Sequence, residues 1–243
     1  MTHIISEMSM ADWAERVNDQ TIVLVPVGIL EGHGPNLPLS TDTYQSVYIC
    51  NRLAEDMDNV LLAPTVHYGQ CSSTANFPGS ISLSFDTVRA LVGDIISEFY
   101  RQGVRNIAVI SGHAGRTHIA AMSEAARGVV ADHPDLHVMT LSDFDLAYER
   151  LGKEFPADDG HGGAVETARV MAIRPDLVRG AGEPHTPKMP RFAHLPNPEE
   201  VWTTGYWGYP DQATPEKGAA LNDWIVEEMK GHLEGMRAGW KQS

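Results

Sequence analysis

Four short apolar runs constrain the fold of this chain more than any other feature of its sequence. They lie at 21–28, 59–66, 106–112 and 136–142. Each run is predominantly apolar and does not alternate regularly with polar residues, as is typical of strands buried on both faces of a parallel sheet. The sequence therefore predicts a mostly parallel sheet that other elements cover on both sides.

Helical stretches separate these runs. The segment 84–103 begins with a Ser/Asp capping signal and ends at a glycine, as many helices do. Asp42 precedes the stretch 43–57 and is a candidate N-cap. Three further helical stretches lie at 117–133, 164–173 and 215–236. Because strands that alternate with helices form right-handed βαβ units, we expect an α/β fold, a three-layer α/β/α sandwich around a mostly parallel sheet.

Length and composition favour a single domain. A chain of 243 residues, 42% of them hydrophobic, can bury its own core, so we expect one domain over 1–243. The segment 180–214 carries six prolines and several aromatic residues, which predicts a long irregular segment that is nevertheless ordered. The net charge of −14 disfavours nucleic acid and anionic membrane surfaces as partners.

The cysteines and the N-terminus indicate a cytoplasmic protein. Cys50 and Cys71 form no CxxC pair, which argues against a thiolate zinc site and fits a reducing compartment. We interpret Cys71 as a buried structural residue. The N-terminal residues show no secretory signal, and no run of about 18 apolar residues occurs, so we expect no membrane span.

Three polar clusters are flanked by glycine. Two of them follow predicted strands, and the third precedes a predicted helix. They contain six candidate functional residues: Glu31, His33, Asp42, His113, His161 and Glu166. Because the carboxyl ends of parallel strands meet at one edge of a sheet, we expect the clusters to converge. Imidazole and carboxylate ligands without a thiolate suit zinc, manganese or iron(II).

Each residue also has a simpler interpretation. Asp42 could be only a helix cap, Glu166 a first-turn glutamate that suits the helix dipole, and His113 a hydrogen-bonded loop residue. The coincidence of three such clusters at matching places favours a metal site. The sequence contains no dinucleotide fingerprint, P-loop or GxSxG elbow.

These clusters, in this order, resemble the creatininase (creatinine amidohydrolase) family. "PVGILEGHGPNLPLSTDT" (26–43) is similar to the first metal-binding signature of that family. Four further elements resemble family motifs: "NFPGSISLS" (76–84), "SGHAGR" (111–116), "HGGAVETA" (161–168) and "GYWGYPDQATPEKG" (205–218). The resemblance covers about residues 22–220 and rests on five motifs in the same order.

The resemblance implies a site and an assembly. It implies one or two divalent metal ions (Zn, Mn or Fe) per chain, an α/β/α sandwich, and a homo-oligomer, commonly a hexamer in this family. The implied metal ligands are Glu31, His33, Asp42, His113 and Glu166, with Asp42 bridging if two ions bind. The implied proton donor or acceptor is His161, and we assign Glu166 to the catalytic residues as well.

The sequence departs from the family at the substrate pocket. Gly115 stands where creatininase itself has a glutamate, and Ala164 replaces another glutamate. Ser73 and Thr74 stand where a Glu-His pair is usual, and Arg116 replaces an asparagine. We therefore do not predict creatinine hydrolysis.

We predict a metal-dependent hydrolase that uses a metal-activated water on a carbonyl of a small molecule. The bond is expected to be the C–N bond of a cyclic amide or formamide, with His161 moving the proton to the leaving nitrogen. The alternatives are hydrolytic C–C ring opening of a cyclic ketone such as a keto-inositol, and peptide trimming. A non-catalytic metal-dependent binding protein is a further alternative, motivated by Ser73 and Thr74.

Three residues keep two interpretations each at this stage. Trp202 and Trp207 could cover the pocket or lie at a subunit contact. Arg116 could bind an anionic group of the substrate or only face solvent.

Overall fold

A parallel sheet lies at the centre of the protein, as predicted. The computed structural model describes residues 2–180 and 182–240. Its strands are β1 (Ile22–Val27), β2 (Val60–Leu62), β3 (Asn106–Ser111) and β4 (His137–Ser142), in the order β2-β1-β3-β4. All pairs are parallel, and every residue of β1, β2 and β3 is buried.

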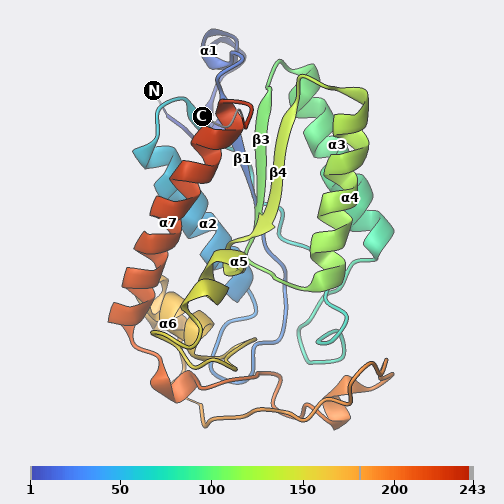
Figure 1. Ribbon diagram of the computed structural model, residues 1–243, viewed down its shortest axis with the longest axis vertical. Helices are drawn as coiled ribbons and strands as arrows, with labels where there is room; N and C mark the ends of the chain where they lie inside the picture. The colour runs from blue at the N-terminus through green and yellow to red at the C-terminus, as the bar shows by residue number, and fades with distance from the viewer. Residues whose placement is uncertain (1, 181, 241–243) are drawn as a thin grey trace.

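Helices cover both faces of the sheet (Figure 1). The helices α3 (Phe85–Arg101) and α4 (Arg116–Asp132) lie on one side. On the other side lie α2 (Thr41–Asp56) and α7 (Pro215–Arg237), and α6 (Ala164–Ile173) packs against both of them. The three-layer α/β/α prediction is therefore confirmed. The periodicity missed two short helices, α1 (Met10–Arg16) and α5 (Asp143–Ala147).

The second strand is shorter than the predicted run 59–66. Pro64 has no amide hydrogen to contribute to the ladder, and β2 ends before it. The chain rejoins β1 at Val66, whose amide donates to the carbonyl of Pro26 at 3.0 Å. Pro26 itself lies beyond the last β1–β2 pair, so its missing amide hydrogen leaves no gap in that ladder.

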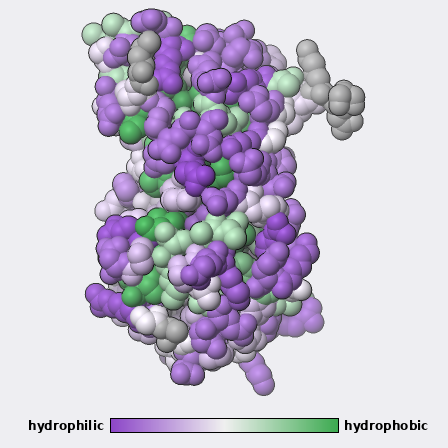
Figure 2. Space-filling model, turned by 90° about the vertical axis from the view of Figure 1, so that its left-hand side faces the viewer, coloured by the Kyte–Doolittle hydropathy of each residue, from purple (hydrophilic) through white to green (hydrophobic). Residues whose placement is uncertain are grey.

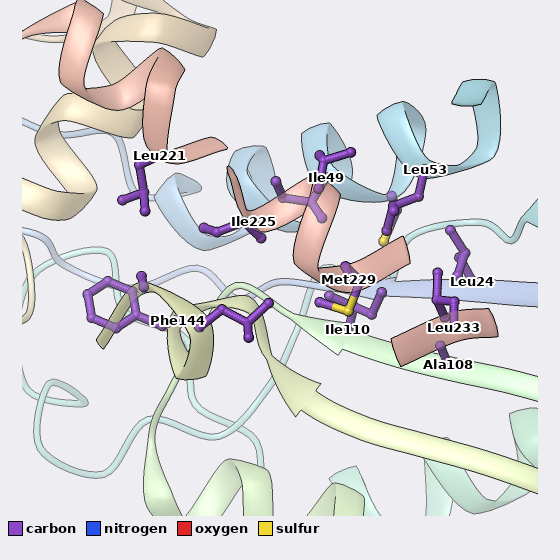
Figure 3. Close-up of a cluster of buried hydrophobic side chains, with 14 of the residues drawn as sticks. Leu24, Ile49, Leu53, Ala108, Ile110, Phe144, Leu221, Ile225, Met229 and Leu233 are labelled. Carbon is purple, nitrogen blue, oxygen red and sulfur yellow. The ribbon is translucent and has the colours of Figure 1, made fainter. Parts of the chain in front are cut away.

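Two hydrophobic cores hold the layers together. Figure 3 shows strand residues Leu24 and Ile110 facing Ile49 of α2 and Met229 of α7. The alternate strand residues face α3 and α4, where Val23, Val25, Ile107 and Val109 meet Val88, Val92, Ile96 and Met122. Burying one such side chain contributes about 1.5–3 kcal/mol, so the alternation fixes which face each helix covers.

The irregular segment 180–214 is ordered against the rest of the chain. Figure 1 shows it (orange) beneath the carboxyl ends of the strands. Short 3-10 turns interrupt it at Pro198–Glu200 and Pro210–Gln212, and Trp202 and Tyr206 are buried. The prediction of a long segment without periodic structure is confirmed by its described residues.

Hydrophilic residues cover most of the face shown in Figure 2, and hydrophobic residues gather there only in small patches. Among the described residues, no helix is both long enough and apolar enough to cross a bilayer.

A buried ion pair joins three helices. Arg169 of α6 donates to Asp143 Oδ2 of α5 at 2.6 Å and to Asn222 Oδ1 of α7 at 2.8 Å. Arg169 and Asp143 are both fully buried. Burial raises the pKa of Asp143, while the charge of Arg169 opposes that rise. The network therefore fixes the position of α6.

Substitution of Arg169 tests this network. Arg169→Leu leaves the Asp143 carboxyl buried without its cation, so we expect the free energy of unfolding to fall by about 3–5 kcal/mol. Urea denaturation measures the change. The control Arg174→Leu removes an exposed pair with Asp176 and should cost at most about 1 kcal/mol. Similar losses in both variants would contradict a special role for the buried pair.

Candidate metal centre

The loop after β1 turns two polar side chains into the interior. Glu31 and His33 are 2% and 1% exposed. His33 Nδ1 lies 3.0 Å from the carbonyl oxygen of Glu31 and therefore donates a hydrogen to it. This bond orients the ring, so that Nε2 faces Asp42 Oδ1 at 3.1 Å.

Asp42 does not cap α2, and that prediction was wrong. The helix begins two residues earlier than expected, at Thr41, with Ser40 in the N-cap position. Asp42 therefore lies in the first turn and its carboxylate points inward. One oxygen faces His33, and the other lies 3.4 Å from His113 Nδ1.

His113 reaches this carboxylate because a glycine after β3 lets the end of that strand approach the start of α2 closely. A Cβ at Gly112 would lie 1.9 Å from the carbonyl oxygen of Asp42, so only glycine permits this approach. Ser111 accepts a hydrogen bond from the His113 amide at 3.0 Å and orders the turn. His113 Nδ1 then lies 2.8 Å from Glu31 Oε2.

The third cluster arrives on α6. Glu166 lies in the first turn of the helix, and its Oε2 accepts a hydrogen bond from the Gly162 amide at 2.5 Å. The same oxygen lies 3.6 Å from His33 Nε2. The five predicted ligands therefore come from two strand ends and two helix starts to one place.

Two sets of ligand atoms share Asp42. One set is Glu31, Asp42 and His113, and the other is His33, Asp42 and Glu166. Within each set the ligand atoms lie within 4.8 Å of one another. Asp42 is therefore the one residue common to both sets.

Several of these atoms lack a partner. In the part of the chain that the structure describes, Glu31 Oε2, Asp42 Oδ2 and His113 Nε2 are buried without a hydrogen bond. Glu31 Oε2 is close to His113 Nδ1, but the contact does not have hydrogen-bond geometry. Because buried unpaired polar atoms are costly, the cluster fits a bound cation better than a closed network. The donor set suits zinc, manganese or iron.

The charged groups of the cluster shift one another's pKa values strongly. Burial alone would lower the pKa of His33, but Asp42 and Glu166 raise it well above its usual value. Glu31 and Asp42 likewise outweigh burial and raise the pKa of His113. Burial opposes the ionised form of Asp42, yet His33 and His113 lower its pKa well below the usual value. Without a metal, protonated imidazoles balance the carboxylates.

His161, the predicted proton carrier, lies beside these ligands. Its ring centroid is 4.1 Å from that of His33. Its Nε2 lies 2.8 Å from the Gly32 carbonyl oxygen and therefore donates to it. His161 also forms a third set of close ligand atoms with Glu31 and His33.

A cavity of about 190 Å³ opens over the cluster. Its walls include Glu31, His113, Glu166, His161 and Trp202. The Trp202 ring is 5.4 Å from that of His161 and is buried, which favours its interpretation as a cover for the pocket. Trp207 instead acts through its backbone, since its amide donates to the His161 carbonyl at 2.5 Å.

Sequence reasoning missed two residues that support the ligands. The Thr74 hydroxyl donates to Glu31 Oε1 and is buried. Asp159 accepts hydrogen bonds from the amides of Ala164 and Val165 at 2.8 and 2.9 Å, and so caps the start of α6. An aspartate shortly before a helix was the available signal for Asp159. Thr74 was named only as a departure from the family motif, and its contact with Glu31 had no local signal because the two residues are 43 positions apart.

His118 was missed as well. It is fully buried on α4, with its ring centroid 5.4 Å from that of His113. Burial, followed by the charge of His113, lowers the pKa of His118 to about 3, so it is neutral. Its Nδ1 accepts a hydrogen bond from the Gln70 amide at 3.3 Å. His118 therefore supports the His113 side of the cluster without adding charge.

Substitution of Thr74 tests the support of Glu31. Thr74→Val keeps the shape of the side chain but removes the hydroxyl, so we expect the affinity for zinc or manganese to fall about 10- to 100-fold. Competition with a chromogenic chelator measures the affinity. The neighbouring variant Ser73→Ala should leave it unchanged. Wild-type affinity in Thr74→Val would show that the hydroxyl does not tune this ligand.

Comparisons with known proteins place the chain among several hydrolases. Creatinine amidohydrolase of Pseudomonas putida is 30% identical over 190 residues, which are 72% of this chain and 73% of that protein. The mycofactocin precursor peptide peptidase of Mycolicibacterium smegmatis (strain ATCC 700084 / mc(2)155) is 28% identical over 214 residues, 82% and 79% of the two chains. The 3-dehydro-scyllo-inosose hydrolase of Thermotoga maritima (strain ATCC 43589 / DSM 3109 / JCM 10099 / NBRC 100826 / MSB8) is 26% identical over 180 residues, 70% and 56%.

The fold and the family profile give the same result. The solved structure "Creatininase Mn" superposes with a TM-score of 0.87 at 24% identity and covers 97% of this chain and 99% of its own. The Creatininase family model, described as creatinine amidohydrolase, matches residues 6–233. A match over nearly the whole length, together with the fold, shows that this chain belongs to the creatininase family.

Proposed function

We propose that this creatininase-family protein is a metal-dependent amidohydrolase that cleaves the C–N bond of a small cyclic amide or formamide. One observation carries the proposal: the two oxygens of the buried Asp42 carboxylate face two separate sets of ligand atoms. The match to creatinine amidohydrolase, whose name describes amide hydrolysis, supports the same class of reaction.

The residues present fit one or two divalent ions. Glu31, Asp42 and His113 would hold one ion, and His33, Asp42 and Glu166 a second. When bound, such an ion would polarise a carbonyl and lower the pKa of a water molecule to about 7. Zinc, manganese and iron all suit these donors, and "Creatininase Mn" supports manganese as one candidate.

His161 and Trp202 have roles other than metal binding. Because His161 Nε2 donates to Gly32, Nδ1 is the nitrogen that accepts a proton in this arrangement. His161 takes a proton from the attacking water and delivers it to the leaving nitrogen. Trp202 covers the cavity above it and limits the entry of further water.

Metal content per chain tests the first half of the proposal. Elemental analysis of the purified protein should find near-stoichiometric zinc, manganese or iron that is lost in both Glu31→Ala and His113→Ala. The control His67→Ala, on an exposed residue, should keep the metal. One equivalent indicates a single ion, and two indicate a pair bridged by Asp42. A wild-type protein that contains no metal even after reconstitution would contradict the proposal.

The role of His161 is tested separately. In a screen of cyclic amides and formamides with the metal-loaded protein, His161→Asn should lower kcat at least about 100-fold. The metal content should stay at the wild-type value. An active His161→Asn variant would assign proton transfer to another group.

The relative from Thermotoga maritima favours a second candidate, the hydrolytic C–C opening of a cyclic ketone. Product analysis separates the two reactions, because amide hydrolysis releases an amine and ketone cleavage gives a carboxylate without one. The peptidase relative also supports peptide trimming. A cavity of about 190 Å³ over the ligands favours a small molecule.

The contacts of Thr74 and His161 disfavour the alternative of a non-catalytic binding protein. Thr74 supports Glu31 where a Glu-His pair was expected. His161 and Glu166 lie beside the other ligands, although metal binding alone requires no proton carrier. The homo-oligomeric state, the cytoplasmic location and the single domain stay predictions.

A further inference from the structure

A second cavity adjoins the metal-side cavity. It has a volume of about 500 Å³. The two cavities share Glu31, Ser73, His113 and Gly115 in their walls. Together they form one cleft that extends from the ligand atoms to the start of α4. Its size is that of a pocket for a small organic molecule, about 300–1,000 Å³.

Gly115 lies where the two cavities meet. A Cβ at this position would lie 2.2 Å from His113 Nε2, so a side chain here is incompatible with the present position of that ring. The absence of a side chain leaves the region between the ligands and α4 open. The next residue, Arg116, lies in the wall of the second cavity only.

Arg116 is a cation without an acidic partner. It is exposed, and within residues 2–180 and 182–240 its side chain forms no ion pair and no hydrogen bond. On the same helix, Arg127 lies 3.6 Å from Glu124.

The start of α4 adds no negative charge beside Arg116. The first turn of α4 contains no acidic residue, and its N-cap, Gly115, has no side chain to accept a hydrogen bond. Burial, Glu166 and Asp145 raise the pKa of Tyr148 in the metal-side cavity, and the charge of Arg116 opposes that rise. The Arg116 guanidinium is therefore close enough to the metal-side cavity to affect a group in its wall.

We propose that Arg116 binds a carboxylate of the substrate, so that the substrate class is an amide bearing a carboxylate. The amide carbonyl lies over the ligand cluster and the carboxylate lies in the second cavity. This assignment rests on the proposed function for the reaction, but the binding step does not require hydrolysis. A planar guanidinium pairs with a carboxylate through two parallel hydrogen bonds. A single cation near the Glu31 carboxylate suits a monoanion better than a phosphate dianion.

A matched pair of ligands tests the proposal. N-acetyl-β-alanine carries a carboxylate, and N-acetyl-β-alaninamide is its neutral counterpart. Isothermal titration of the metal-loaded full chain with each compound gives two dissociation constants for the wild type. Arg116→Gln and Arg116→Lys are measured beside it. Arg127→Gln makes the same charge change on the same helix, away from the cleft.

We expect the wild type to bind the carboxylate at least about tenfold more tightly than the amide. Arg116→Gln should remove this difference without changing the affinity for the amide or the metal content. Arg116→Lys should keep part of it. Equal affinities in the wild type, no measurable binding of the carboxylate, or an equal loss in Arg127→Gln would each overturn the proposal. If the carboxylate preference holds but no amide is hydrolysed, the proposed function fails and the assignment of Arg116 stands.

Discussion

The buried carboxylate of Asp42 is the contact on which the rest of the site depends. Its two oxygens face imidazoles from two different loops, so a single side chain sets the spacing between them. Removal of three carboxylates from water is costly unless cations compensate for them. In the metal-free protein, the raised pKa values of His33 and His113 supply that compensation. A bound divalent cation would replace those protons, because only neutral imidazoles coordinate a metal.

The scaffold holds this cluster by packing as well as by charge. Gly112 lets the end of β3 touch the start of α2, which brings His113 to Asp42. Asp159 caps α6, and the buried Arg169 of the same helix pairs with Asp143 of α5. Glu166 therefore lies on a helix whose position is fixed. Functional side chains on helix starts and strand ends move less than side chains on free loops. The site is therefore preorganised for its ligand.

Much of this arrangement could be predicted from the sequence, for reasons that also explain the failures. The apolar runs revealed the parallel sheet, and the geometry of such sheets brought Glu31 and His113 to one edge. Asp42 was misassigned as a cap because an error of two residues in a helix start exchanges a cap for a first-turn position. Thr74 escaped because its contact is made across distant chain segments and follows no local period. The segment 180–214 has no periodicity from which Trp202 could have been placed.

The ligand cluster and most of the wall of the second cavity come from different parts of the fold. The ligands sit where strands and helices meet, positions that any protein with this sheet and these loops would share. The second cavity shares Glu31 and His113 with the ligand cluster, and the rest of its wall comes from the turn after β3, the loop around Ser73 and the irregular segment 180–214. These parts contribute little to the cores between the sheet and its helices, so they can change without loss of the fold. Arg116 stands at the boundary, one residue beyond the glycine that keeps the cleft open. With the proposed role of Arg116, a single position would select the substrate while the residues of the buried cluster remain the same.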